Sequence, residues 1–179
     1  MKDELERETL SDDLKKVKAL EIAGKAEKLY SQWESEWYEI QSIDIEELDR
    51  DLYSAETYID KFNFKRADEV IMNSGELIAN IKDRIAGIRR EIKELTEVEP
   101  RNRELYEEIV VEYKELNREL LAKRHQYGAA AEQFEQNIKE IAPQLDDFKL
   151  LTSTGKYLEA QEKINSVKEL IDSLKERME

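Results

Sequence analysis

The residues that could carry out chemistry are few, and their spacing does not bring them together. The chain has one histidine, His125, which follows Lys123 and Arg124 and has no cysteine or second histidine with which to share a metal ion. A nucleophilic serine would need that same histidine as its base, and no motif supports such a pair. The five glycines are scattered singly, so no glycine-rich phosphate loop is present. We therefore expect no catalytic, metal-binding or cofactor-binding residue, no cofactor and no enzyme activity.

Other side chains could bind a partner, but simple packing explains most of them. The densest basic run extends from Arg84 to Lys93 and is interleaved with glutamates, which is typical of ion pairs along a helix surface. Trp33 and Trp37 lie one helical turn apart, a spacing typical of core or junction packing. Partner-binding residues therefore stay unassigned. The aromatic candidates for an exposed patch outside the apolar stripes are Tyr30, Tyr38, Tyr53 and Phe148, and the alternative for each is packing at a bundle junction.

The composition favours an all-α protein and disfavours several partners. Among 179 residues 40% are charged, while only five are glycine and two are proline, and few chains so poor in helix breakers are anything but helical. A net charge of −14 argues against nucleic acid and anionic membrane surfaces as main partners. No cysteine is present, so no disulfide can form. No apolar run approaches the ~18 residues of a membrane span, and no signal peptide opens the chain.

Apolar positions of the first half recur in the second half, which indicates an internal repeat. Ile71 matches Ile164, an offset of 164 − 71 = 93 residues, and Leu52 matches Leu145 in the same register. The period suits one three-helix unit, and units stacked on one another form an extended rod. We predict an all-α, elongated fold of three-helix-bundle repeats that share a long continuous helix.

The helical periodicity and its interruptions divide the chain into two repeats. We place the first repeat at residues 1–97, with helices at about 11–21, 25–41, 44–61 and 65–97. The second repeat, incomplete or truncated, is placed at residues 98–179, with helices at about 98–141, 144–152 and 156–178.

The long shared helix is predicted from one heptad phase that runs from Ile78 to Phe134 and passes through Pro100. The preserved phase favours a single kinked helix, from about Lys65 to Ile141, over two helices that meet at the proline. In either case the same phase predicts that four isoleucines lie in the core, namely Ile81, Ile85, Ile88 and Ile92.

Short polar or helix-breaking segments predict where the helices begin and end. Residues 11–13 (Ser-Asp-Asp) are expected to cap the first helix, and residues 42–44 (Ser-Ile-Asp) to form a break and a new cap. Asn63 is expected to adopt the left-handed conformation in a turn. Pro143, after Ala142, is expected in the first turn of the helix that follows a break.

Four segments resemble the family of the septation ring formation regulator EzrA of low-GC Gram-positive bacteria. They are GKAE leading into WESEWYEI at residues 24–40, FNFKRA at 62–67, LLAKRHQYG at 120–128 and LTSTGKYLEA at 151–160. Their order and spacing together are specific, although each is weak alone. The resemblance covers about Leu14 to Glu179 and corresponds to the N-terminal part of the family's longer protein.

The resemblance implies a cytoplasmic rod of spectrin-like repeats that follows an N-terminal membrane-spanning helix absent from this chain. It implies a regulator that binds FtsZ, negatively regulates assembly of the division ring, and meets other division and cell-wall synthesis proteins. The expected location is the cytoplasmic side of the cell membrane at the division septum, with this fragment itself soluble. The alternative is a purely structural spectrin-like spacer or scaffold whose binding surfaces lie outside this fragment. No family site residue maps to a position of this chain.

Overall fold

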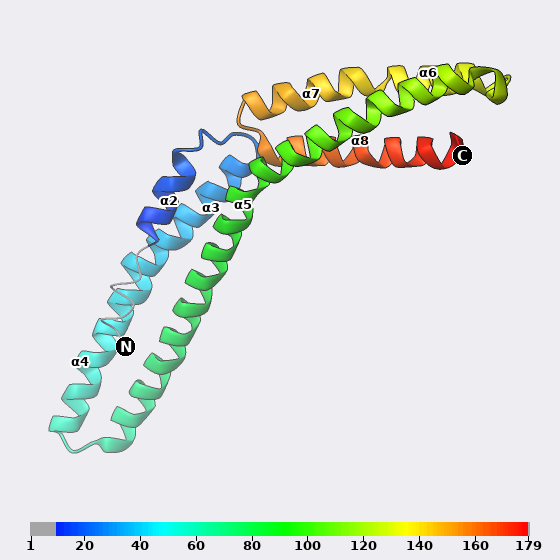
Figure 1. The fold of residues 1–179 in the computed structure, drawn as a ribbon. Helices are drawn as coiled ribbons and strands as arrows, with labels where there is room; N and C mark the ends of the chain where they lie inside the picture. Colours follow the sequence, from blue (N-terminus) through cyan, green and yellow to red (C-terminus); the bar gives the residue numbers. More distant parts are fainter. Residues whose placement is uncertain (1–9, 179) are drawn as a thin grey trace. The chain divides into compact units, whose positions relative to one another are not determined.

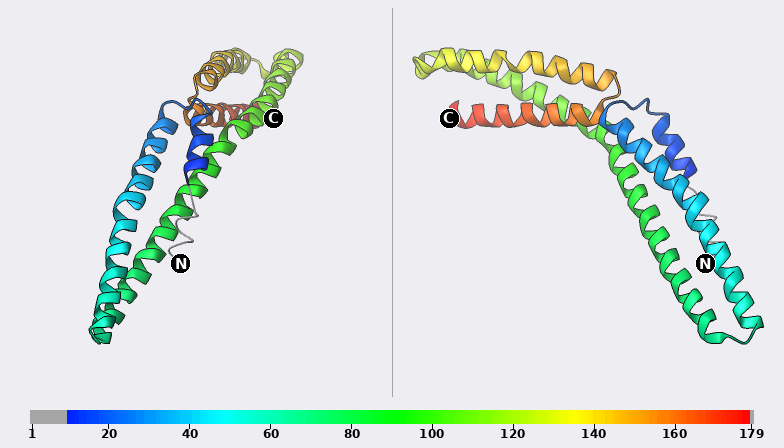
Figure 2. Two further views of the ribbon diagram at one scale, coloured as in Figure 1. Left: turned by 90° about the vertical axis from the view of Figure 1, so that its left-hand side faces the viewer. Right: turned by 180° about the vertical axis from the view of Figure 1, so that it is seen from behind.

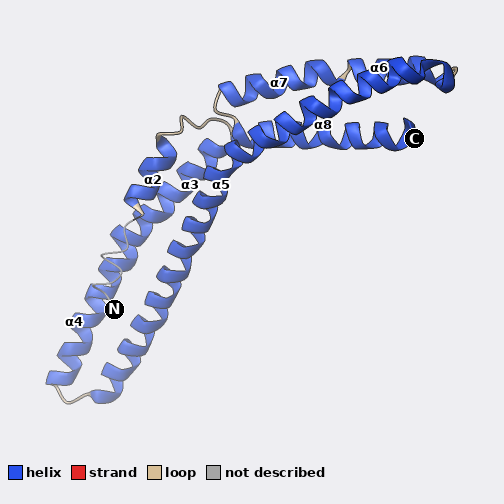
Figure 3. Cartoon of the chain, in the orientation of Figure 1, coloured by secondary structure: helices blue, strands red, loops and turns tan. Residues whose placement is uncertain are grey.

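The computed structural model describes residues 10–178, and the regular elements among them are all helices (Figure 3). In chain order these are α2 (Ser11–Lys18), α3 (Lys25–Glu39), the π-helical turn η1 (Ile40–Asp44), α4 (Ile45–Asp60), α5 (Phe64–Tyr127), α6 (Ala130–Lys139), α7 (Ile141–Ser153) and α8 (Tyr157–Met178). The predicted all-α fold class is confirmed, as is the presence of one long continuous helix.

The helices group into two compact units, each described separately below. Unit 1 comprises the described residues up to Ala19 together with Lys28–Glu94, and unit 2 comprises Leu20–Glu27 together with the residues from Leu95 onward. The boundary therefore falls inside α5. The short segment Leu20–Glu27 belongs to unit 2, although the residues on both sides of it belong to unit 1.

Helix α5 is continuous over 64 residues and contains Pro100. At a rise of ~1.5 Å per residue such a helix is about 96 Å long. Ion pairs one turn apart span the proline, since Arg101 pairs with Glu97 and Arg103 with Glu99. These pairs link the turns on either side of the backbone bond that proline cannot make. Of the two alternatives drawn from the heptad phase, the structure contains the single helix.

The prediction that this helix extends to Ile141 is wrong, because α5 ends at Tyr127. Gly128 follows with φ of 53°, a left-handed conformation that glycine adopts without steric cost, and α6 begins two residues later. The rings of Tyr127 and Phe134 pack edge to face across this turn, with centroids 5.4 Å apart. The apolar phase therefore continues past Gly128 even though the helix does not.

The predicted break at residues 42–44 is also wrong, because α3 passes into α4 through the π-helical turn η1. The extra residue of a π turn shifts the helix phase without ending the helix. Ile40 and Asp44, at the two ends of η1, are both buried.

The predicted cap at residues 11–13 is not formed, since α2 is preceded by Leu10 and has no side-chain cap bond. Helix α2 ends at Lys18, before the predicted residue 21.

Helices α4 and α5 of unit 1 are joined by a tight turn and run antiparallel, side by side (Figures 1 and 2). The turn is where it was predicted, but the left-handed residue is Phe62, with φ of 59°, and not Asn63. The Asn63 side chain instead accepts the backbone N–H of Arg66 at 3.5 Å, as a weak cap of α5. The predicted core is confirmed along α5, where the buried isoleucines are Ile81, Ile85, Ile88 and Ile92.

Unit 2 is a three-helix bundle of the α5 segment from Leu95, the consecutive helices α6 and α7, and α8 (Figure 1). A break at Glu140 separates α6 from α7, and Pro143 lies in the first turn of α7, where its missing N–H costs little. One cluster of buried side chains joins the three helices; it includes Ile109, Leu116, Ile138, Leu145, Phe148, Ile164 and Ile171.

Candidate interaction surfaces

The tryptophan pair is part of the core of unit 1 and does not form an exposed binding patch. Trp33 and Trp37 of α3 are both buried. The Trp33 indole Nε1 donates a hydrogen bond of 2.7 Å to Oε2 of Glu91 in α5, so the polar edge of the ring has a partner and its faces are free to pack. The packing interpretation of this pair is confirmed.

A groove between α2 and α3 brings together several aromatic and basic side chains of unit 1. Its volume is about 390 Å³, and its lining residues are Ser11, Leu14, Lys15, Lys18, Tyr30, Glu34, Trp37, Tyr38 and Gln41. Tyr38 is exposed, while the Tyr30 hydroxyl donates a 2.7 Å hydrogen bond to Glu34. Partial burial and this bond raise the pKa of Tyr30 to about 12, so the phenol stays neutral at physiological pH. The groove is a candidate docking surface for an apolar or aromatic side chain flanked by acidic groups.

The remaining aromatic candidates lie elsewhere. Tyr53 is exposed on α4. Phe148 is buried in unit 2, where its ring stacks on Tyr106 with centroids 5.1 Å apart and an interplanar angle of 11°. Phe148 is therefore not available as an exposed contact. Tyr38 and Tyr53 are the two candidates that the structure leaves on the surface.

Arg84 of α5 holds the π-helical turn against the first part of α5 in unit 1. Its guanidinium lies 2.7 Å from Asp44, 2.9 Å from Glu36 and 3.6 Å from Glu39. Burial acts to lower the pKa of Arg84, but the hydrogen bond to Glu36 and the nearby carboxylate charges outweigh burial and raise it. Arg84 thus belongs to a structural ion cluster, and a planar guanidinium suits such multiple carboxylate contacts.

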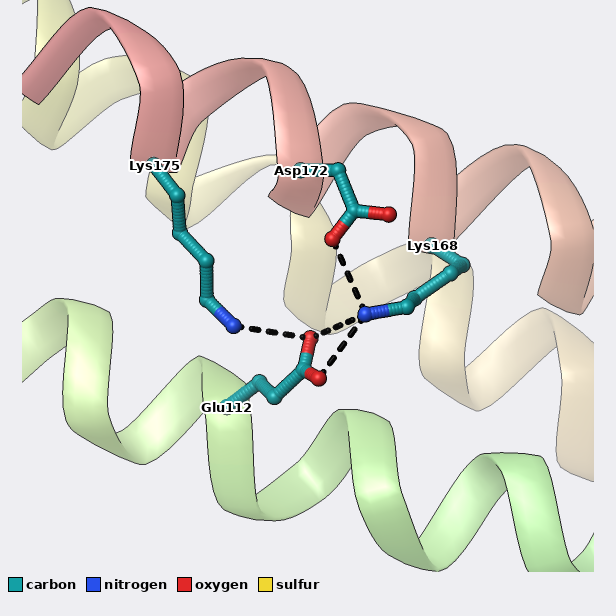
Figure 4. A network of polar contacts seen from close by, with 4 residues as sticks. All are labelled: Glu112, Lys168, Asp172 and Lys175. Atoms are coloured by element: carbon teal, nitrogen blue, oxygen red, sulfur yellow. Dashed lines mark hydrogen bonds and ion pairs between the residues drawn. The ribbon is translucent and has the colours of Figure 1, made fainter.

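A second ion cluster joins α5 to α8 in unit 2 (Figure 4). Lys168 donates to both carboxylate oxygens of Glu112 at 2.8 Å and to Asp172 at 2.9 Å, while Lys175 lies 3.2 Å from Glu112. Partial burial acts to raise the pKa of Glu112, but the hydrogen bonds and charges of the two lysines outweigh it and lower the pKa. The same bonds to Glu112 raise the pKa of Lys168. The cluster aligns two helices and offers no unpaired catalytic group.

The segment Leu20–Glu27 lies against the start of α8 within unit 2. Ala23 donates its backbone N–H to the Gly155 carbonyl at 2.9 Å, and the Tyr157 hydroxyl donates to the Leu20 carbonyl at 3.2 Å. The Glu159 carboxylate accepts the backbone N–H of Lys25 at 2.9 Å, as a cap for the first residue of α3. Sequence reasoning missed Glu159, because its partner is distant along the chain and carries no sequence signal for the contact.

The residues first considered for chemistry are dispersed. His125 is exposed near the end of α5. Lys123 pairs with Glu119 at 2.6 Å and Arg124 with Glu135 at 3.2 Å, so this basic pair is neutralised locally. Within residues 10–178, no group of histidine, cysteine and carboxylate side chains is arranged to hold a metal ion. In the part of the chain that the structure describes, no helix is both long and apolar enough to cross a membrane.

The described residues form an all-helical protein of two units, and its surface carries a groove and ion pairs between helices. The family model of the septation ring formation regulator EzrA matches residues 1–179, and the chain belongs to that family. It is 30% identical over 167 residues to septation ring formation regulator EzrA of Geobacillus sp. (strain WCH70), covering 93% of this chain and 30% of that protein.

Two further relatives carry the same description. The protein of Bacillus velezensis is 29% identical over 171 residues, which cover 96% of this chain and 30% of the relative. The protein of Staphylococcus epidermidis (strain ATCC 35984) is 29% identical over 178 residues, which cover 99% of this chain and 32% of the relative. The chain spans about a third of the length of the relatives it matches.

Proposed function

We propose that this chain is part of the cytoplasmic rod of a bacterial cell-division regulator that binds FtsZ and negatively regulates assembly of the division ring. Family membership over the whole chain carries the proposal. The two compact units are proposed to be successive spectrin-like repeats, and the parent protein is proposed to act at the septum on the cytoplasmic side of the membrane.

The described surface supports a role in binding. The groove lined by Tyr30, Trp37 and Tyr38 combines apolar rings with Lys15 and Lys18, and rigid aromatic side chains next to cations are frequent anchors in protein interfaces. The net charge of −14 repels an acidic partner at long range. Binding therefore depends on short-range contacts and is expected to be weak for one fragment, with gains when contacts repeat along a polymer.

Co-sedimentation of this chain with FtsZ polymers tests the proposal. We expect a fraction of the chain to pellet with the polymers and polymer mass to fall as the chain is added. Tyr38→Ala should reduce co-sedimentation, whereas Tyr53→Ala, which removes an equally exposed tyrosine away from the groove, should not. Equal binding by both variants would exclude the groove. Absence of binding by the chain and by a longer family member would exclude FtsZ as the partner.

The alternative is a purely structural spacer, and the continuity of α5 over 64 residues favours it. A continuous helix of this length, about 96 Å at a rise of ~1.5 Å per residue, suits a spacer. Under this alternative the chain would not bind FtsZ, while a longer family member that contains further repeats would. The same co-sedimentation experiment distinguishes the two functions.

A further inference from the structure

The segment Leu20–Glu27, which we call the strap, connects α2 to α3 and includes the first turn of α3. It belongs to unit 2, whereas the residues on both sides of it belong to unit 1. The hydrogen bonds that attach it to the start of α8 join Ala23 to Gly155, Leu20 to Tyr157 and Lys25 to Glu159. Each bond uses a backbone group of the strap, so the strap is attached mainly through its main chain.

Glycines on both sides of this contact allow a close approach. Gly155 has φ of 74°, and a Cβ atom there would lie 2.1 Å from the carbonyl oxygen of Glu21. Gly24 of the strap has φ of 65°, and a Cβ atom there would lie 2.2 Å from Oε1 of Glu159. Glycine adopts these backbone angles without steric cost. The strap therefore has a defined docked position at the start of α8.

The docked strap buries little apolar surface. Ala26 is buried, but Leu20 is 39% exposed, and Ile22 and Ala23 are only partly buried. Within α8 itself, by contrast, Ile164 is fully buried in the core of unit 2. Apolar burial supplies most of the stability of a folded segment, so a segment with little of it opens at low free energy.

Strain and desolvation in the docked state also favour opening. Glu21 has φ of 50°, a left-handed conformation in which a residue with a side chain is strained. Among the described residues, Oε2 of Glu159 is buried without a hydrogen-bond partner, which is unfavourable for a carboxylate oxygen. The hydrogen bonds of Leu20 and Lys25 are exposed to solvent, so water replaces them at a small net cost.

We propose that the strap is a latch, which opens and closes on the start of α8 as one piece while the helices of unit 2 stay folded. When the latch is closed, Glu159 caps the first backbone amide of α3. When it is open, α3 loses this cap, and α5 is the one connection among the described residues that still joins the two units through folded structure. Opening of the latch is independent of the proposed binding to FtsZ.

Native-state hydrogen exchange of the whole chain, measured for each residue by NMR, tests the proposal. The reporters are the amides of Ala23 and Lys25, because both donate to acceptors at the start of α8. The references are the amides of Ile164 and Ile171 in the middle of α8. We expect the protection factors of the reporters to be at least ~100-fold lower than those of the references. They should also be nearly independent of low urea concentrations, because opening exposes little surface.

Glu159→Ala tests whether the strap opens as one piece. The variant removes the acceptor of Lys25 but leaves the bond from Ala23 to Gly155 in place. In a latch both amides lose protection together, and we expect a loss of about tenfold at each of them for the one hydrogen bond removed. Glu169→Ala is the matched control, because Glu169 is an exposed glutamate further along the same helix. The control should leave the protection of both reporters unchanged.

Gly24→Ala perturbs the same contact from the side of the strap. The added methyl group would collide with the Glu159 carboxylate, so the protection of both reporter amides should again fall together. Circular dichroism should show unchanged helicity in this variant and in Glu159→Ala, and the amides of Ile164 and Ile171 should keep their protection.

Two results would overturn the proposal. Equal protection and equal urea dependence of the reporters and the references would show that the strap separates only when unit 2 unfolds. Loss of protection at Lys25 alone in Glu159→Ala would show that the strap frays residue by residue and does not move as a latch.

Discussion

The indole of Trp33 in α3 and the carboxylate of Glu91 in α5 are joined by a hydrogen bond of 2.7 Å. Trp33 is buried, so its Nε1–H needs a partner within the protein. The bond satisfies the one polar atom of the ring, and the remaining ring surface contributes apolar burial to the core of unit 1.

We expect Trp33→Phe to lower the free energy of unfolding by about 1–3 kcal/mol, because ring volume and a hydrogen bond are lost together. Glu91→Gln should have a smaller effect, since an amide oxygen can still accept from the indole. Urea unfolding followed by circular dichroism measures both. The fluorescence of the wild-type chain should be blue-shifted and move to the red only on unfolding; red-shifted emission from the folded chain would contradict burial of the pair.

Gly155→Ala should destabilise the chain, because residue 155 has φ of 74° and a Cβ there would lie 2.1 Å from the Glu21 carbonyl oxygen. The substitution should separate Leu20–Glu27 from α8 and cost more than ~1 kcal/mol. Gly75→Ala provides the opposite control, since Gly75 sits inside α5 and an added methyl group there would meet nothing within 4 Å. That variant should gain about 0.5–1 kcal/mol. A stabilising Gly155→Ala would refute the close approach.

Pro100→Ala should raise the free energy of unfolding by on the order of 1–3 kcal/mol, because alanine restores a helical hydrogen bond within α5 and removes a steric clash. Pro143→Ala is the control, since that proline lies in the first turn of α7, where no helical bond is lost. Thermal melts of the two variants should differ clearly. Loss of stability in Pro100→Ala would mean that the local geometry of α5 at this point requires proline.

The lowered pKa of Glu112 predicts a loss of stability in acid. A carboxylate whose folded pKa lies below its unfolded value contributes stability that is complete above about pH 4.5 and is lost as the pH falls through the folded pKa. Glu112→Gln should therefore be less stable than wild type by on the order of 1 kcal/mol at pH 7, and the difference should shrink below pH 4.5. Chemical unfolding at several pH values measures this difference.

Glu135→Gln is the control for this pH dependence. Hydrogen bonding to Lys139 and the nearby charges also lower the pKa of Glu135, but its partners Lys139 and Arg124 are exposed to solvent. Its effect on stability should be small at all pH values, because water screens the pairs. A pH-independent difference between Glu112→Gln and wild type would show that charge is not the cause of the Glu112 effect.

The heptad pattern of apolar residues correctly predicted the buried side of α5, because heptad spacing places apolar side chains along one side of a helix. Ile81 and Ile85 are core residues as predicted, and the phase across Pro100 correctly indicated a continuous helix. The same reasoning failed at Gly128, since Tyr127 and Phe134 keep the apolar phase across a turn. It also predicted a break at η1, because Ser42 and Asp44 are residue types that commonly cap helices.

The candidate surfaces were less predictable, because they depend on contacts between distant parts of the chain. Glu159 and Lys25 are separated by 134 residues, and neither has a neighbour that signals their hydrogen bond. The exposure of Ile71 could not be read from its type or phase, which are those of the buried Ile164.

The attachment of Leu20–Glu27 to α8 limits how the chain can be divided. A single cut between Glu94 and Leu95 would leave Gly155 without the amide of Ala23 and Glu159 without the amide of Lys25. The C-terminal unit is thus assembled from two separate stretches of the chain. Excising one unit at a single cut would leave these groups without their hydrogen-bond partners, so unit 2 keeps these contacts only when both of its stretches are present.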